Sequence, residues 1–135
     1  MKYMLSITGF FLSLFVTSQL SATLVDDLLQ EYQKAGASGF DAARGEALWK
    51  KSFPDPKGAG KERSCTTCHT DNLRNAGKHA TTGKAIEPLA PSVNNKRLTD
   101  RKEIEKWFLR NCKWTLGREC SAQEKGDILL YLRSQ

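Results

Sequence analysis

The sequence predicts a small all-α domain that follows a short N-terminal leader. Apolar side chains recur at helical spacing in four segments, no segment shows the alternation of a β-strand, and a long stretch without periodicity separates the second and third segments. Helices are expected at residues 23–35, 42–52, about 99–111 and from residue 121 toward the C-terminus. A domain this small buries a limited core, so a covalent cofactor and a disulfide would both stabilise it.

Residues 1–22 have the organisation of a secretory signal peptide. Lys2 gives a positive start, an apolar run covers residues 4–16, and small residues end the segment. The run is shorter than the roughly 20 residues that span a bilayer, so a membrane anchor is the weaker interpretation. We therefore expect cleavage after residue 22 and a mature domain of residues 23–135 that is exported and not embedded in a membrane.

The mature domain would carry 20 basic and 15 acidic side chains, which is a mildly basic balance. The charges are scattered and no basic stripe has interleaved aromatics, so we expect no binding of nucleic acid. A positive patch that attracts an acidic redox partner and an ordinary solvated surface both remain open.

Capping residues support the expected helices in order along the chain. The first helix has two aspartates in its first turn, and Asp41 is placed to cap the second. Residues 54–60 hold two prolines and two glycines and are expected to form a loop. Thr99 or Asp100 caps the third helix, and residues 121–124 form a capping box that opens the last one.

The strongest chemical signal is the pentapeptide Cys65-Thr66-Thr67-Cys68-His69. Two thiols three positions apart reach the two vinyl groups of one haem, and the adjacent histidine is then placed as the proximal iron ligand. A zinc site would need further ligands, for which only Cys112, Cys120 and His79 are candidates. A thioredoxin-like motif would need a βαβ setting, and a plain disulfide within the motif would leave the histidine unexplained. The motif therefore predicts one covalent haem c.

The helices around the motif predict how the domain packs. Gly45 is small enough to let a second helix approach, Trp49 follows one turn later, and Tyr131 lies on the last helix. This arrangement resembles the class I cytochrome c fold, whose first and last helices cross in this way. In that family a downstream proline carbonyl orients the proximal imidazole, and Pro88, with Pro91 as second choice, matches it. We expect one domain of four to five helices around one covalent haem.

The mature domain contains no methionine, because Met1 and Met4 both lie in the leader. The common electron-transfer pair of histidine and methionine ligands therefore cannot form, and the sixth iron position must be filled by another group or stay open. His79 is the only other histidine, although a surface histidine in a polar loop is the favoured interpretation. Lysines would have to lose a proton before they bind iron.

Asn111 is the unusual candidate for the sixth ligand. It precedes the last helix by about ten residues, in the stretch where class I cytochromes carry their methionine ligand. For an arbitrary asparagine, a helix C-terminus is the ordinary interpretation. Cys112 and Cys120 change this, because they are a natural pair if haem takes the motif cysteines. A disulfide between them would fix the loop that carries Asn111 over the distal face of the haem.

A set of short stretches spans the mature domain: Ser64 to His69, Thr82-Gly83-Lys84 to Ile86, Pro88 to Ser92, Glu105-Lys106-Trp107, Arg110-Asn111-Cys112, Gly117 to Cys120 and Glu124-Lys125. Together they resemble the sphaeroides haem protein (SHP) family of monohaem class I cytochromes c. Asn111 with the Cys112 and Cys120 pair is the most distinctive part, because an asparagine ligand is rare. In the loop after Cys112, Trp114 is bulkier than the family pattern.

The resemblance implies a periplasmic protein of a Gram-negative bacterium, with His69 and Asn111 as ligands of ferric iron and Pro88 and Trp107 as further haem contacts. On reduction Asn111 is expected to leave, and the ferrous iron to bind oxygen, nitric oxide or carbon monoxide. The expected electron donor is a dihaem cytochrome c linked to a membrane cytochrome b. An amide oxygen is a hard, weak donor that suits ferric better than ferrous iron, which is an independent reason to expect ligand binding.

Two other functions stay open. One is a plain electron carrier with His69 and His79 as ligands, which would be low-spin in both oxidation states. The other is a small enzyme, such as a nitric oxide dioxygenase or an oxygen reductase, with Lys113, Arg118 and His79 as candidates for proton handling. We favour an electron-transfer and ligand-binding protein over an enzyme and assign no catalytic residue.

Overall fold

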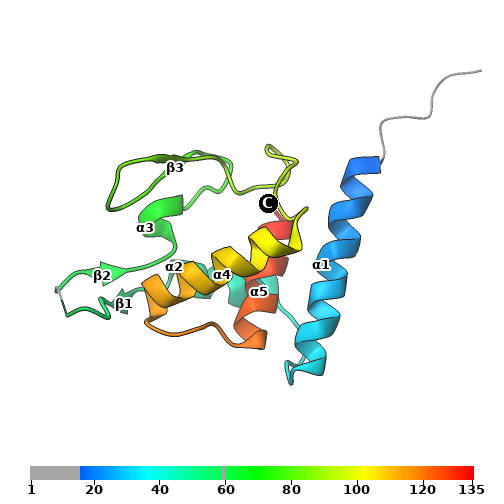
Figure 1. Ribbon diagram of the computed structural model, residues 1–135, viewed down its shortest axis with the longest axis horizontal. Helices are drawn as coiled ribbons and strands as arrows, with labels where there is room; N and C mark the ends of the chain where they lie inside the picture. Colours follow the sequence, from blue (N-terminus) through cyan, green and yellow to red (C-terminus); the bar gives the residue numbers. More distant parts are fainter. Residues whose placement is uncertain (1–15, 59) are drawn as a thin grey trace, which may run out of the picture.

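A computed structural model describes residues 16–58 and 60–135, which form five helices and two short hairpins (Figure 1). This architecture confirms the predicted all-α class. The predicted signal peptide lies mostly outside the described residues, so its cleavage stays a prediction. The elements are α1 (Val16–Lys34), α2 (Ala42–Lys50), β1 (Phe53–Pro54), β2 (Glu62–Arg63), α3 (Thr66–His69), β3 (Gly77–Lys78), β4 (Ala85–Ile86), α4 (Arg101–Leu116) and α5 (Ala122–Arg133).

The crossing of α2 and α5 is the closest helix contact in the fold, and it depends on Gly45. A Cβ atom at this position would lie 2.1 Å from the carbonyl oxygen of Asp127 and 2.9 Å from the Cβ of Tyr131. Any larger side chain would therefore push the two helices apart. The ring of Tyr131 lies 6.0 Å from that of Trp49, between ring centroids. The predicted approach of these two helices at Gly45 is confirmed.

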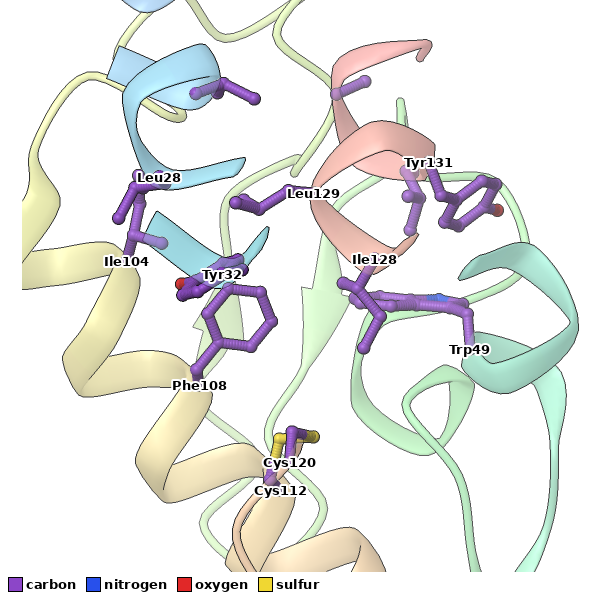
Figure 2. Close-up of a cluster of buried hydrophobic side chains, with 13 residues drawn as sticks. Leu28, Tyr32, Trp49, Ile104, Phe108, Cys112, Cys120, Ile128, Leu129 and Tyr131 are labelled. Atoms are coloured by element: carbon purple, nitrogen blue, oxygen red, sulfur yellow. A yellow bond between two sulfur atoms is a disulfide. The ribbon is translucent and has the colours of Figure 1, made fainter. Parts of the chain in front are cut away.

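One buried cluster joins α1, α2, α4 and α5 (Figure 2). Leu28 of α1 and Leu129 of α5 are completely buried, and α1 packs along α5. Phe108 of α4 and Trp49 of α2 extend the cluster toward the haem motif. Burial of side chains of this size contributes about 1.5–3 kcal/mol each, so this cluster is the main source of stability in the domain.

Helix α4 is longer than the sequence indicated. The predicted end was near Asn111, but the helix continues to Leu116 and stops at Gly117, whose φ of 73° is left-handed. The reason is that Thr115 continues the buried stripe of Ile104 and Phe108 for one more turn. Gly117 is then the residue that can leave the helix without a Cβ penalty. Asn111 therefore lies inside a helix.

The caps and loops follow the local sequence with one difference. Asp41 and Ser121 cap α2 and α5, and the capping box of Ser121 with Glu124 is present. The segments expected to be irregular contain two antiparallel pairs, β1–β2 and β3–β4, of two residues per strand. Pairs this short carry no alternating pattern that the sequence could display.

In Figure 1, α3 and both hairpins lie on the side opposite α1. No helix within the described residues is long and apolar enough to cross a membrane.

Candidate functional site

The Cys65–His69 motif forms one helical turn. Cys65 stands at the N-cap of α3, and its carbonyl accepts hydrogen bonds from the backbone N–H of Cys68 and of His69. Both thiols are half-buried and free. Burial raises the pKa of the Cys65 thiol to about 12, so the group is a neutral thiol and not an activated redox thiolate. No βαβ unit, which is the setting of a thioredoxin-like dithiol, occurs among the described residues.

The His69 ring is half-buried and packs against an aromatic side chain. It lies against Trp49 at 5.5 Å between centroids, and its buried Nδ1 has no hydrogen-bond partner among the described residues. Burial, and then the positive charge of Arg97, lowers the pKa of His69 to about 4. The imidazole is therefore neutral at physiological pH, which is the form that binds a metal. The position of Trp49 beside His69 was not predicted, because its spacing along the helix indicated only a packing role.

The predicted hydrogen bond between Pro88 and His69 is not present. The carbonyl of Pro88 instead accepts from Nε of Arg97 at 2.9 Å and from Nδ2 of Asn94 at 3.2 Å. A guanidinium is a charged donor and competes well for a carbonyl oxygen. Arg97 also donates to the carbonyl of Glu87, so it holds the segment on which Pro88 lies. No sequence pattern identifies Arg97 as the partner of these carbonyls.

The β3–β4 hairpin packs on the motif and accounts for His79. A Cβ at Gly77 would lie 2.1 Å from the carbonyl oxygen of Cys68, and the N–H of Ala80 donates to Cys68 Sγ at 3.4 Å. His79 itself is exposed, and its Nδ1 accepts the backbone N–H groups of Thr81 and Thr82. These contacts favour the surface-histidine interpretation of His79 over a role as an iron ligand.

Asn111 is half-buried on α4, at the edge of the buried stripe. Phe108, three residues before it, and Thr115, four residues after it, are both buried. The Asn111 side chain makes no hydrogen bond with the described residues, so its amide is available. Trp107, one turn earlier, is 44% exposed, and its Nε1 donates to Glu103. The rest of the chain therefore leaves the Trp107 side chain largely exposed, and its contact with haem stays a prediction.

A disulfide joins Cys112 and Cys120, with a Cα–Cα distance of 5.5 Å, and both residues are buried. The bridge uses neither motif cysteine, so both motif thiols stay available for a haem. It also removes the two cysteines that a zinc site would have needed. Because Cys112 directly follows Asn111, the bridge restrains the backbone of the helix end that carries Asn111.

Both predicted sides of the site border the same buried cluster. The cluster that contains Trp49, which contacts His69, also contains Phe108 and Cys112, which flank Asn111 (Figure 2). Cys65 packs against the same cluster. The residues present fit a covalent haem: two free thiols on one turn, and a half-buried neutral imidazole whose buried Nδ1 is unpartnered among the described residues.

Comparisons with known proteins agree on one family. The family described as "Domain of unknown function (DUF1924)" matches residues 35–132. The cytochrome c-type protein SHP of Cereibacter sphaeroides is 42% identical over 80% of this chain and 81% of its own length. Cytochrome c'' of Methylophilus methylotrophus is 43% identical over 67% of this chain, and the match spans 62% of the relative.

Solved structures give the same result. The structure of oxidised SHP, described as an oxygen-binding cytochrome c, matches with a TM-score of 0.73 and 39% identity over 82% of this chain and 96% of that one. The crystal structure of oxidised cytochrome c'' matches with a TM-score of 0.73 and 36% identity over 87% of this chain and 95% of the other. A solution structure of cytochrome c'', described as giving insight into haem-ligand detachment, matches with a TM-score of 0.71.

Proposed function

The chain belongs to the family of SHP and cytochrome c'', and we propose that within it the protein accepts electrons from a partner and binds a diatomic gas beside Asn111. As a member of this family it is a class I cytochrome c with one covalent haem c. We assign Cys65 and Cys68 to the two thioether bonds and His69 to the proximal position. The observation that supports the proposal most is the position of Asn111 on a helix restrained by the neighbouring disulfide, in a mature domain without methionine.

A haem held by Cys65, Cys68 and His69 would supply an iron that changes between ferric and ferrous states and that could take one further ligand. The residues determine what that ligand is. Asn111 offers an amide oxygen, which is a hard and weak donor that holds ferric iron better than ferrous iron. The amide is not engaged elsewhere in the described residues, so it can bind or swing away without breaking another contact. Reduction would therefore free the position for oxygen, nitric oxide or carbon monoxide.

The relatives support this proposal from two directions. SHP is described as binding oxygen, and work on cytochrome c'' is described in terms of haem-ligand detachment. Ligand release combined with gas binding is the behaviour that Asn111 would produce in this chain. A further part of the proposal is the setting: export to the periplasm, and electron supply from a dihaem cytochrome c that is linked to a membrane cytochrome b.

Optical spectra of the holoprotein test the proposal. The ferric protein is expected to be low-spin, and the dithionite-reduced protein high-spin with a spectral change on addition of carbon monoxide or nitric oxide. Asn111→Ala should make the ferric form high-spin and leave carbon monoxide binding to the ferrous form intact. Asn95→Ala, at an exposed asparagine, is the matched control and should change neither form. A reduced protein that stays low-spin and does not respond to carbon monoxide would exclude the proposal.

A further inference from the structure

We propose that Arg63 is a positioning residue for Asn111: it fastens the C-terminal end of α4 to the segment that leads into the haem motif, and so holds the Asn111 amide in place. This inference rests on the proposed function, because it assumes that Asn111 is the releasable ligand. The residues that carry it are Asp55, Arg63 and Trp114, which we call the Arg63 clamp.

Arg63 is fixed by an ion pair before it reaches α4. Its Nη2 lies 2.7 Å from Oδ1 of Asp55, and the two side chains are only 15% and 5% exposed. A pair buried this well is screened little by solvent, and the planar guanidinium keeps one orientation. Asp55 and Arg63 flank the turn between β1 and β2, and the strands are paired through Phe53 and Arg63. The arginine is therefore preorganised on its own hairpin.

The same guanidinium also caps the C-terminal end of α4. Nη1 of Arg63 donates to the carbonyl oxygen of Trp114 at 2.9 Å, and the guanidinium carbon lies 4.5 Å from the centroid of the Trp114 ring. The last four carbonyls of a helix have no partner within the helix, and Trp114 carries one of them because α4 ends at Leu116. A cation at that end also interacts favourably with the helix dipole. The hydrogen bond and the stacking contact act on the same residue.

A second contact seats the hairpin on the same helix end. A Cβ at Gly117 would lie 3.0 Å from Cγ of Pro56, so the turn of the hairpin packs directly on the C-cap of α4. Because Arg63 precedes Cys65 by two residues, the clamp connects the attachment point of the haem with the helix that carries Asn111. The disulfide between Cys112 and Cys120 also restrains this end of α4.

The clamp makes a specific statement about ligand release. Trp114 follows Asn111 by three residues, which is less than one helical turn, so fixing the Trp114 backbone also fixes the Asn111 backbone. Asn111 then leaves iron by rotation of its own side chain, and it returns from a backbone that has not moved. Loosening the clamp should weaken the ferric bond of Asn111 and leave the ferrous site, where Asn111 is already released, unchanged.

The test uses imidazole, a neutral competitor of Asn111, added to the ferric holoprotein. Arg63→Gln should raise imidazole affinity about three- to tenfold, because the variant loses both the charged cap of α4 and the cation–π contact with Trp114. Carbon monoxide affinity of the ferrous form should stay within about twofold. Arg101→Gln is the matched control, because Arg101 forms an ion pair with Glu31 at the opposite end of α4. It should change neither affinity.

A double-mutant cycle with Asn111→Ala separates positioning from a general structural effect. Arg63→Gln should have no further effect once Asn111 is gone, and an equal effect in that background would overturn the proposal. No effect of Arg63→Gln, with a strong effect of Asn111→Ala, would overturn the role of Arg63 alone. No effect of Asn111→Ala would overturn the proposed function instead.

Two further variants keep the test decisive if Arg63→Gln does not fold. Arg63→Lys retains the charge but loses the planar fork that binds Asp55 and Trp114 at once. Its imidazole affinity should therefore lie between those of the wild type and Arg63→Gln. Trp114→Leu keeps the capped carbonyl and removes the ring, so it should shift imidazole affinity in the same direction by less than Arg63→Gln. A shift in the opposite direction in either variant contradicts the clamp.

Discussion

The side of the domain that carries His69 and the side that carries Asn111 are held in different ways. The half-buried His69 ring packs against Trp49 with its Nδ1 buried, and its position follows from a five-residue motif on one helical turn. Asn111 has a half-buried, unengaged side chain on a helix that other elements fasten at both ends. The difference shows that a permanent ligand can be placed by a short local motif and a packed ring, whereas a releasable ligand needs a fixed backbone and a free side chain.

The N-terminal half of α4 has its own fastening, separate from the Arg63 clamp. Glu105 accepts a hydrogen bond from the hydroxyl of Tyr32 on α1 and forms a 2.7 Å ion pair with Lys125 on α5. The ammonium of Lys125 also lies 5.4 Å from the centroid of the Tyr32 ring. These contacts tie α4 to two other helices. The two ends of α4 can therefore be loosened separately.

Removing the disulfide should have the largest effect. Replacing Cys112 and Cys120 together by serine is expected to lower the free energy of unfolding by about 2–3 kcal/mol, because the closed loop is short. It should also raise ferric imidazole affinity, since the end of α4 is freed, and leave ferrous carbon monoxide affinity unchanged. Chemical denaturation and ligand titration measure the two effects. Lost stability with unchanged imidazole affinity would mean that the bridge does not hold Asn111.

The same two sides differ in how much of them the sequence predicted. The haem motif, the Asp41 cap, the capping box at Ser121 and the helix crossing at Gly45 are local patterns or small-residue rules, and the structure confirms these caps and the crossing. The axial roles of His69 and Asn111 stay predictions.

The parts that were missed depend on tertiary contacts that local sequence patterns do not show. The end of α4 was placed near Asn111, because the buried position of Thr115 is a tertiary feature, although Gly117 was a usable stop signal. The partner of Pro88 proved to be Arg97, nine residues away, and the Arg63 clamp joins positions 51 residues apart. No propensity or spacing rule identifies which carbonyl an arginine will cap.

Loosening the N-terminal fastening should have a smaller, pH-dependent effect. Burial alone would raise the pKa of Glu105, but hydrogen bonds from Lys125 and Tyr32 outweigh it and lower the pKa. A lowered carboxyl pKa gives stability that is present above about pH 4.3, the ordinary glutamate value, and is lost as the pH falls through the folded-state pKa.

Glu105→Gln should therefore cost about 1 kcal/mol or less at neutral pH, because the carboxylate is partly exposed, and should flatten the loss of stability in acid. Thermal unfolding at a series of pH values measures it. Glu46→Gln, which breaks only the exposed ion pair with Lys50, is the control and should keep the wild-type acid profile. An unchanged acid profile for Glu105→Gln would show that this network does not fasten α4.

The smallest effect is expected at His79, and it decides whether the His69 side can supply its own second ligand. The hairpin that carries His79 packs on Cys68, but the imidazole is exposed and its Nδ1 accepts two backbone N–H groups of the hairpin turn. His79→Ala should thus leave the ferric and ferrous spectra unchanged and lower stability by at most about 1 kcal/mol, the net value of such hydrogen bonds. If instead the ferric protein became high-spin in His79→Ala and stayed low-spin in Asn111→Ala, the two histidines would be the ligands. The protein would then be a plain electron carrier, and the fastening of α4 would have no bearing on the iron.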